Sequence, residues 1–208
     1  EILNISFDDE NIISDQKIIS LINNESNLEI ESMEIAGKRK LTDALPIIKD
    51  RINVDNKEKQ LIAAAAIRNI DPDSSNKEKD LLLSAFDSND ENICSLIIKQ
   101  MKNDNEILPD DKLIKYLNEQ SFMVRNASLS VAEKRASLVL LPHIIQCLSD
   151  PRCSIPARSA LQVYNDDDVV KLLIEHTQNQ NTEKSLVIGV IRTIKKYPTK
   201  DSIDMLLS

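Results

Sequence analysis

The sequence predicts an all-α fold, a right-handed α-solenoid built from about six helical hairpins. Apolar residues recur at helical spacing along nearly the whole chain. The 208 residues include only 2 glycines, whereas β-hairpin turns and the phosphate loops of nucleotide-binding α/β folds depend on glycine. The helical stretches come in pairs that return about every 30 residues, a spacing typical of stacked helical hairpins.

The helices are expected in six pairs, separated by polar turns. These pairs are 15–23 with 27–37, 41–52 with 57–70, 76–87 with 91–101, 109–118 with 122–133, 137–150 with 154–164, and 166–177 with 182–197. Residues 200–208 begin a seventh, truncated pair, so one repeat domain is expected over 14–208. Residues 1–13 are short and acidic and form either a linker or a partial helix.

Special residues mark several of the expected helix ends. Gly37 is placed as a C-cap, because glycine readily adopts the left-handed conformation that ends many helices. Pro46 and Pro142 fall near the start of first helices, where the missing N–H group costs least. The acidic run 166–168 also stands at a helix start, where it interacts favourably with the helix dipole.

One apolar anchor in each first helix can be followed through the chain. The anchors are Ile18, Leu45, Leu82, Ile114, Leu141, Val170 and Ile203. The same periodicity predicts a buried core that includes Leu45, Ile48, Ala64, Ile67, Val124, Leu141, Ile144, Ala160, Val170, Leu173, Val187 and Ile191.

Four stretches resemble the HEAT-repeat family of α-solenoids. "ALPIIKDRI" (44–52) and "LLPHIIQCLSDP" (140–151) look like the first helix of a HEAT repeat, with its proline. "MVRNASLSVAE" (123–133) and "IPARSALQVY" (155–164) look like the second helix, with its arginine and small residues. The resemblance implies that Arg125 lies early in a second helix and pairs with a carboxylate or carbonyl of a nearby turn, where Asp150 and Glu119 are the acidic residues.

A few residues bear on metal binding and on catalysis. His143 and Cys147 are four residues apart on one expected helix, with Cys153 after a turn, yet zinc needs further ligands. We expect Cys147 to pack as a small apolar side chain and His143 to be partly exposed, with no metal or cofactor. The chain has no glycine-rich phosphate loop and no motif of a catalytic serine or cysteine, so we expect that it is not an enzyme.

The cysteines and the hydropathy pattern bear on location. Three cysteines without a CxxC pair favour a reducing compartment over a disulfide framework. No apolar run reaches the roughly 18–20 residues needed to cross a bilayer. We therefore expect a cytoplasmic protein, or a cytoplasmic domain of a larger one, that does not insert directly into a membrane.

Charge is sorted between the helices. The second helices, taken as 27–40, 56–69, 90–102, 121–135, 152–164 and 182–196, contain 17 of the 26 Lys and Arg but 8 of the 34 Asp and Glu. Second helices line the concave face of helical solenoids, so a basic inner surface is expected on a chain of net charge −8. The preference of basic residues for helix C-termini explains part of this sorting. The candidate binding residues that this preference explains least are Arg68, Lys99, Arg158 and Arg192.

The function expected from these features is a non-catalytic binding scaffold. Its concave face would hold a protein or peptide that is acidic at the contact, while nucleic acid is disfavoured by the net charge. One alternative is a soluble regulatory module excised from a larger protein, such as a membrane transporter. The other is a HEAT-like enzyme, such as a lyase or a DNA glycosylase, which a deep pocket with a buried carboxylate would support.

Overall fold

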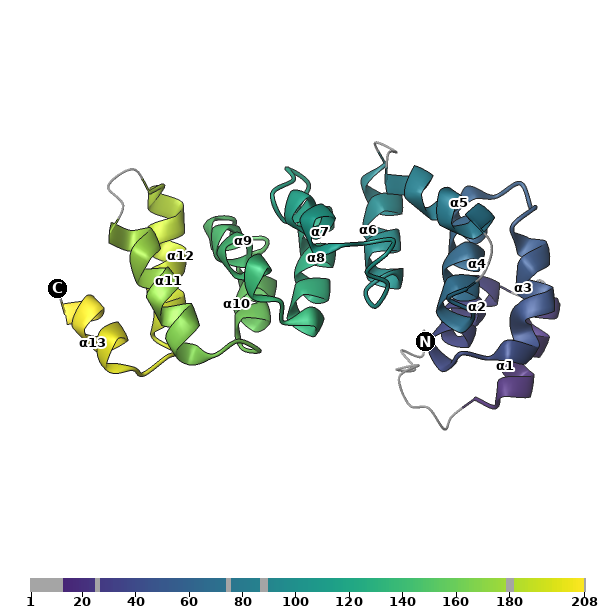
Figure 1. Ribbon diagram of the computed structural model, residues 1–208, viewed down its shortest axis with the longest axis horizontal. Helices are drawn as coiled ribbons and strands as arrows, with labels where there is room; N and C mark the ends of the chain where they lie inside the picture. Colours follow the sequence, from purple (N-terminus) through teal and green to yellow (C-terminus); the bar gives the residue numbers. More distant parts are fainter. Residues whose placement is uncertain (1–12, 25–26, 74–75, 87–89, 179–181, 208) are drawn as a thin grey trace. The chain divides into compact units, whose positions relative to one another are not determined.

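The computed structural model describes residues 13–24, 27–73, 76–86, 90–178 and 182–207. These residues form thirteen α-helices and three short 3-10 helices, with no strand among them (Figure 1). The predicted all-α class is therefore confirmed. The expectation for the N-terminal segment lies almost wholly outside the described residues, because only Ile13 of that segment is described.

The chain divides into two compact units, Glu1–Asn89 and Asp90–Ser208. The boundary falls inside the third expected hairpin, between helix α5 (Asn76–Phe86) and helix α6 (Glu91–Gln100). Each unit is described by itself below.

The first unit is organised around one helix whose central part is enclosed. Its elements before α5 are α1 (Asp15–Asn23), α2 (Glu29–Arg39), η1 (Thr42–Ala44), α3 (Leu45–Arg51) and α4 (Lys57–Ile70). Helix α4 packs against α2, α3 and α5, and each residue from Leu61 to Arg68 is buried. A helix that is apolar on all sides is expected to lie inside a domain, and the four consecutive alanines leave room for close neighbours.

Gly37 serves a packing role that the sequence did not reveal. The C-cap of α2 is Lys40, which adopts the left-handed conformation with φ of 56°, so the prediction that Gly37 is the C-cap is wrong. Gly37 lies within α2, and a Cβ atom there would stand 2.9 Å from Cα of Ala66 on α4. Glycine is required here because the backbones of the two helices approach too closely for a side chain.

The second unit consists of helix pairs joined by short turns. After α6 its elements are α7 (Asp110–Leu117), α8 (Phe122–Arg135), η2 (Leu138–Leu140), α9 (Leu141–Gln146), η3 (Cys147–Ser149), α10 (Ser154–Leu161), α11 (Asp166–Gln178), α12 (Lys184–Ile194) and α13 (Lys200–Leu207). Helix α8 packs against α6, α7 and α10, and α12 packs against α11 and η3. The single helix expected over 137–150 is thus three short helical segments.

Side-chain caps fix where several helices begin. The side-chain oxygen of an N-cap residue accepts a hydrogen bond from a free N–H group of the first turn. Such caps are Ser14 before α1, Asn56 before α4, Asp90 before α6 and Ser121 before α8. Pro46 and Pro142 lie in the first turns of α3 and α9, as expected.

The same local arrangement occurs once in each unit, 96 residues apart. Arg39 at the end of α2 donates to the carbonyl oxygen of Ile13 and to Asp15, at 2.8 and 3.0 Å. Arg135 at the end of α8 donates to Leu108 O and Asp110 at 2.6 and 3.1 Å. The residue after each arginine has positive φ, and a 3-10 turn with a proline-led helix follows. The two units therefore share one helical building block, defined by this arginine, the left-handed residue after it and the proline-led helix that follows.

Most of the predicted core is buried. Nine of the twelve named residues have less than a tenth of their surface exposed, namely Ile48, Ala64, Ile67, Val124, Leu141, Ile144, Ala160, Val170 and Leu173. Leu45 and Val187 are half-buried, and the prediction for Ile191 is wrong, because it is 37% exposed. The buried face of α12 includes Gly189, Val190 and Thr193, so Ile191 points away from it.

Candidate functional site

The structure brings together two of the four predicted binding residues. Arg158 on α10 and Arg192 on α12 line the same pocket in the second unit. Lys99 on α6 is exposed but does not line this pocket.

The expectation that Arg68 faces solvent is wrong. Arg68 belongs to the enclosed helix α4 and is only 6% exposed. Its Nη1 atom donates to the carbonyl oxygen of Pro72 at 2.9 Å, beyond the C-terminus of the helix. Arg68 therefore donates a hydrogen bond to a backbone oxygen inside the first unit. Because it is buried there, the four predicted binding residues do not form one surface.

The pocket lies between α12 and the turn that leads into α10. Its volume is about 270 Å³. One face of α12 lines it at helical spacing, with Ser185, Ile188, Gly189, Arg192 and Thr193. The opposite wall consists of Leu148, Ser149, Pro151, Ser154 and Arg158. The walls thus combine two cationic groups and several hydroxyl groups with a lining that is otherwise mostly apolar.

Gly189 determines how closely the two walls approach. A Cβ atom at this position would lie 2.4 Å from the carbonyl oxygen of Leu148. Because backbone cannot move aside as a side chain can, any larger residue would push α12 away from η3. The glycine therefore sets the geometry of the pocket as well as the packing.

The arginines of the pocket differ from the other arginines in their partners. Five of the eight arginines form ion pairs with aspartate or glutamate, namely Arg39, Arg51, Arg125, Arg135 and Arg152. Arg68 is bound to a carbonyl oxygen. Within the described part of the chain, Arg158 bonds only to Ser154 O, through Nε at 3.1 Å, and Arg192 has no hydrogen bond or ion pair. Both guanidinium groups in the pocket lack a carboxylate partner among these residues.

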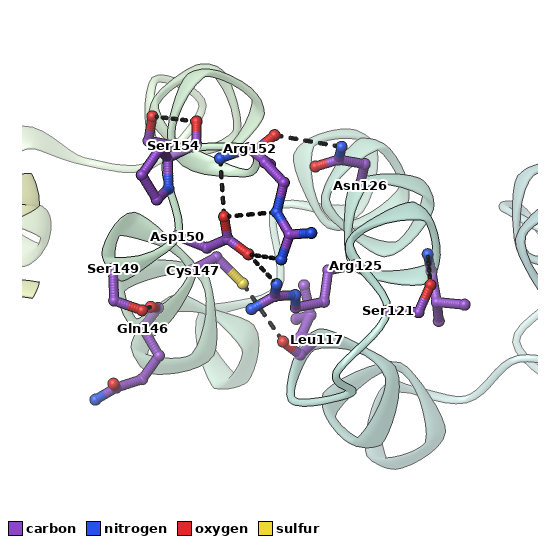
Figure 2. A network of polar contacts seen from close by, with 12 residues as sticks. Leu117, Ser121, Arg125, Asn126, Gln146, Cys147, Ser149, Asp150, Arg152 and Ser154 are labelled. Carbon is purple, nitrogen blue, oxygen red and sulfur yellow. Dashed lines mark hydrogen bonds and ion pairs between the residues drawn. The ribbon is translucent and has the colours of Figure 1, made fainter. Parts of the chain in front are cut away.

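An ion-pair network holds the turn that forms one wall. Arg125 on α8 pairs with Asp150, one of the two acidic residues considered from the sequence, and Figure 2 shows the same carboxylate bound by Arg152. Arg152 donates to Asp150 through Nε and Nη2 at 3.1 and 2.9 Å, and its guanidinium lies 4.9 Å from the ring centre of Phe122. The only carboxylate in the wall segment 148–154 is therefore neutralised by two arginines.

These contacts also change the acidity of Asp150. Hydrogen bonds from Arg152, assisted by Arg125, lower the pKa of the Asp150 carboxyl well below its ordinary value of 3.8. The group is thus fully ionised at neutral pH. Its two cationic partners keep this charge from repelling an anion in the adjacent pocket.

The substitution Asp150→Asn is expected to make the free energy of unfolding less dependent on pH in the acidic range. A carboxyl whose pKa is lower in the folded state adds stability that is fully present above its unfolded pKa and is lost as the pH falls through the folded value. The wild type should therefore exceed Asp150→Asn in unfolding free energy at neutral pH, and the difference should shrink below about pH 4. Urea unfolding over a pH series measures this, and a difference that stays constant down to pH 2 would contradict it.

The residues weighed for zinc and for catalysis have other partners. Cys147 is buried, its Sγ donates to Leu117 O at 3.4 Å, and burial raises the pKa of its thiol to about 12. His143 is partly exposed, with Nδ1 3.2 Å from Nδ2 of Asn118, and burial lowers its pKa. Cys147 thus packs as a small apolar group, as predicted, and its thiol stays protonated at neutral pH. No cluster of three or more potential metal ligands occurs among the described side chains.

The sequence pattern predicted only two of the ten residues that line the pocket, Arg158 and Arg192. The pattern gave no signal for Ser185 or Gly189, although Gly189 is one of only two glycines and stands inside an apolar helix, which is an unusual position.

No described helix is both long and apolar enough to cross a membrane. No family model matches the chain, and no curated protein matches it either.

Proposed function

We propose that the protein is a non-catalytic binding scaffold, and that the pocket between α10 and α12 holds an anionic group of a protein or peptide partner. The observation behind the proposal is that the two arginines without a described carboxylate partner lie together in one pocket. Guanidinium groups are suited to carboxylates and phosphates because their N–H groups form a planar fork. An anionic group of a partner would supply the negative charge that these two arginines lack.

The architecture behind the proposal is a HEAT-like solenoid of about six hairpins. Supporting it are the helix pairs joined by short turns and the building block that recurs after 96 residues, with its arginine, its left-handed residue and its proline-led helix. Repeats of this kind present a preformed surface on which many modest contacts add up. Preformed surfaces bind without the entropic cost of ordering flexible segments.

The pocket itself favours binding over catalysis. Its described lining residues include no Asp, Glu, His or Cys, so the side chains that most often act as a general acid or base are not among them. An enzyme of the lyase or glycosylase type would need a carboxylate in such a pocket. Asp150, the nearest acidic residue along the wall segment, is instead tied to Arg125 and Arg152.

The test is whether acidic peptides bind through the two arginines. We expect a library of Asp- and Glu-rich peptides to bind with an affinity that falls as salt rises. The double variant Arg158→Ala/Arg192→Ala should weaken binding about tenfold, since each exposed ion pair contributes about 0–1 kcal/mol. Fluorescence anisotropy at several salt concentrations measures both effects.

A matched control variant distinguishes the loss of the binding site from a general loss of positive charge. Lys195→Ala/Lys196→Ala removes the same net charge from exposed positions just after α12, outside the pocket lining. This control should bind like the wild type. Binding that is indifferent to salt, or equally weakened by both double variants, would refute the proposed site.

A further inference from the structure

We infer that the ligand of the pocket is a phosphoryl group, carried on a phosphorylated serine or threonine of a partner peptide. The inference rests on the proposed function and specifies its ligand. It follows from the charge of the pocket, from its uncommitted hydrogen-bond donor, and from its size and apolar rim.

The charge of the pocket suits a dianion. Arg158 and Arg192 bring two positive charges, and neither is offset by a described carboxylate partner. A carboxylate side chain carries a single negative charge, which one guanidinium satisfies with two parallel hydrogen bonds. A phosphoserine or phosphothreonine carries about −1.5 to −2 at pH 7 and has three acceptor oxygens, so it can engage both arginines at once.

One buried hydroxyl provides a further donor. The hydroxyl groups of Ser149, Ser154 and Thr193 donate to backbone carbonyl oxygens at 2.8, 3.1 and 2.8 Å. The Oγ atom of Ser185 is buried and has no hydrogen-bond partner among the described residues. A buried hydroxyl without a partner costs free energy, and rotation of the Ser185 side chain would let this hydroxyl donate to a ligand oxygen in the pocket that the residue lines.

The size of the pocket fits one side chain rather than a cofactor. Its volume of about 270 Å³ is at or below the lower end for small-molecule sites, which span about 300–1,000 Å³. The apolar Ile188 in the lining is 42% exposed, and Ile155 and Ile191 on the same two helices are 72% and 37% exposed. The Ile188 side chain can take up an apolar neighbour of the phosphorylated residue in a peptide, whereas the other two isoleucines lie outside the pocket lining.

A peptide is favoured over a lipid headgroup as the source of the phosphoryl group. An anionic membrane is an extended negative surface, which attracts clusters of several basic residues. The chain has a net charge of −8, so it is repelled by such a surface. A single phosphorylated side chain needs only the local positive charge of the pocket.

The experiment compares three peptide libraries that are random except for a fixed central residue, which is phosphoserine, glutamate or serine. We expect the phosphoserine library to bind about tenfold more tightly than the glutamate library, because a second charged hydrogen-bonding partner is engaged. The serine library should bind most weakly. Anisotropy with labelled libraries measures all three affinities on the intact chain.

Variants of the pocket residues test whether the preference for phosphoserine over glutamate depends on the pocket. Arg158→Ala/Arg192→Ala should remove the difference between the phosphoserine and glutamate libraries, and Ser185→Ala should reduce it several-fold, while Lys195→Ala/Lys196→Ala should preserve it. Arg192→Ala alone gives a second variant that removes no hydrogen bond or ion pair made by the described residues, so it is expected to leave the fold intact. Circular dichroism confirms that each variant is folded.

The outcomes separate this inference from the proposed function. If glutamate binds as tightly as phosphoserine through the two arginines, phosphoryl recognition is wrong and the anion-binding scaffold stands. If no library depends on the arginines, both are wrong. Inorganic phosphate that binds as tightly as the phosphoserine library, or phosphatidic acid vesicles that bind through the same arginines, would refute the peptide as the source.

Discussion

Replacement of Glu29 by alanine is expected to lower the free energy of unfolding of the first unit by about 3–5 kcal/mol. Glu29, at the start of α2, is only 2% exposed and contacts two cations. Its Oε1 lies 2.5 Å from Nε of Arg51, and its Oε2 accepts a hydrogen bond from Nζ of Lys59 at 2.6 Å. Without Glu29, two positive charges would stay close together in a largely buried place.

Two further variants show whether buried charge causes this loss. Asp15→Ala breaks the ion pair with Arg39, in which Asp15 is 58% exposed, and should cost only about 0–1 kcal/mol. Glu29→Met/Arg51→Met replaces the closest pair by apolar groups and should recover most of the stability lost in Glu29→Ala. Chemical unfolding measures all three variants. Equal losses in Glu29→Ala and Asp15→Ala would contradict the importance of burial.

Replacement of Ile144 by alanine is expected to destabilise the second unit by about 2–5 kcal/mol. Ile144 on α9 is completely buried, so truncation removes apolar contacts and leaves a cavity. Urea unfolding followed by circular dichroism measures the change.

Ile191 provides the matched control for this prediction. Ile191→Ala removes the same atoms from a side chain that is 37% exposed, and should cost clearly less. Both residues belong to the second unit, so the comparison does not depend on how the two units unfold. A cost for Ile191→Ala that equals that of Ile144→Ala would contradict the burial seen here and restore the original prediction for Ile191.

One ion pair between successive helices has opposite polarity in the two units. Glu29 and Arg125 occupy positions 96 residues apart, each in the first half of a second helix. In the first unit this position is the acid, which contacts Arg51 near the end of α3. In the second unit it is the base, which contacts Asp150 after η3. An arginine-based repeat pattern therefore could not detect the first hairpin, although the contact is of the same type.

The sequence alone determined the helical class, most helix positions and the nine buried residues predicted correctly. These depend on interactions within a few residues, such as apolar periodicity, polar N-caps and proline in first turns. The resemblance to a repeat pattern also indicated that Arg125 pairs near a turn, although it did not decide between Asp150, Glu119 and a backbone carbonyl.

Only the tertiary structure decided which basic residues can form a site. Charge counting treated Arg68 and Arg158 alike, yet α4 is enclosed by three helices and buries Arg68, whereas Arg158 faces a pocket. The close approach of Gly189 to Leu148, 41 residues away in the sequence, sets that pocket. Exposure and contact between distant segments depend on how helices pack against each other, and local spacing in a sequence does not contain this information.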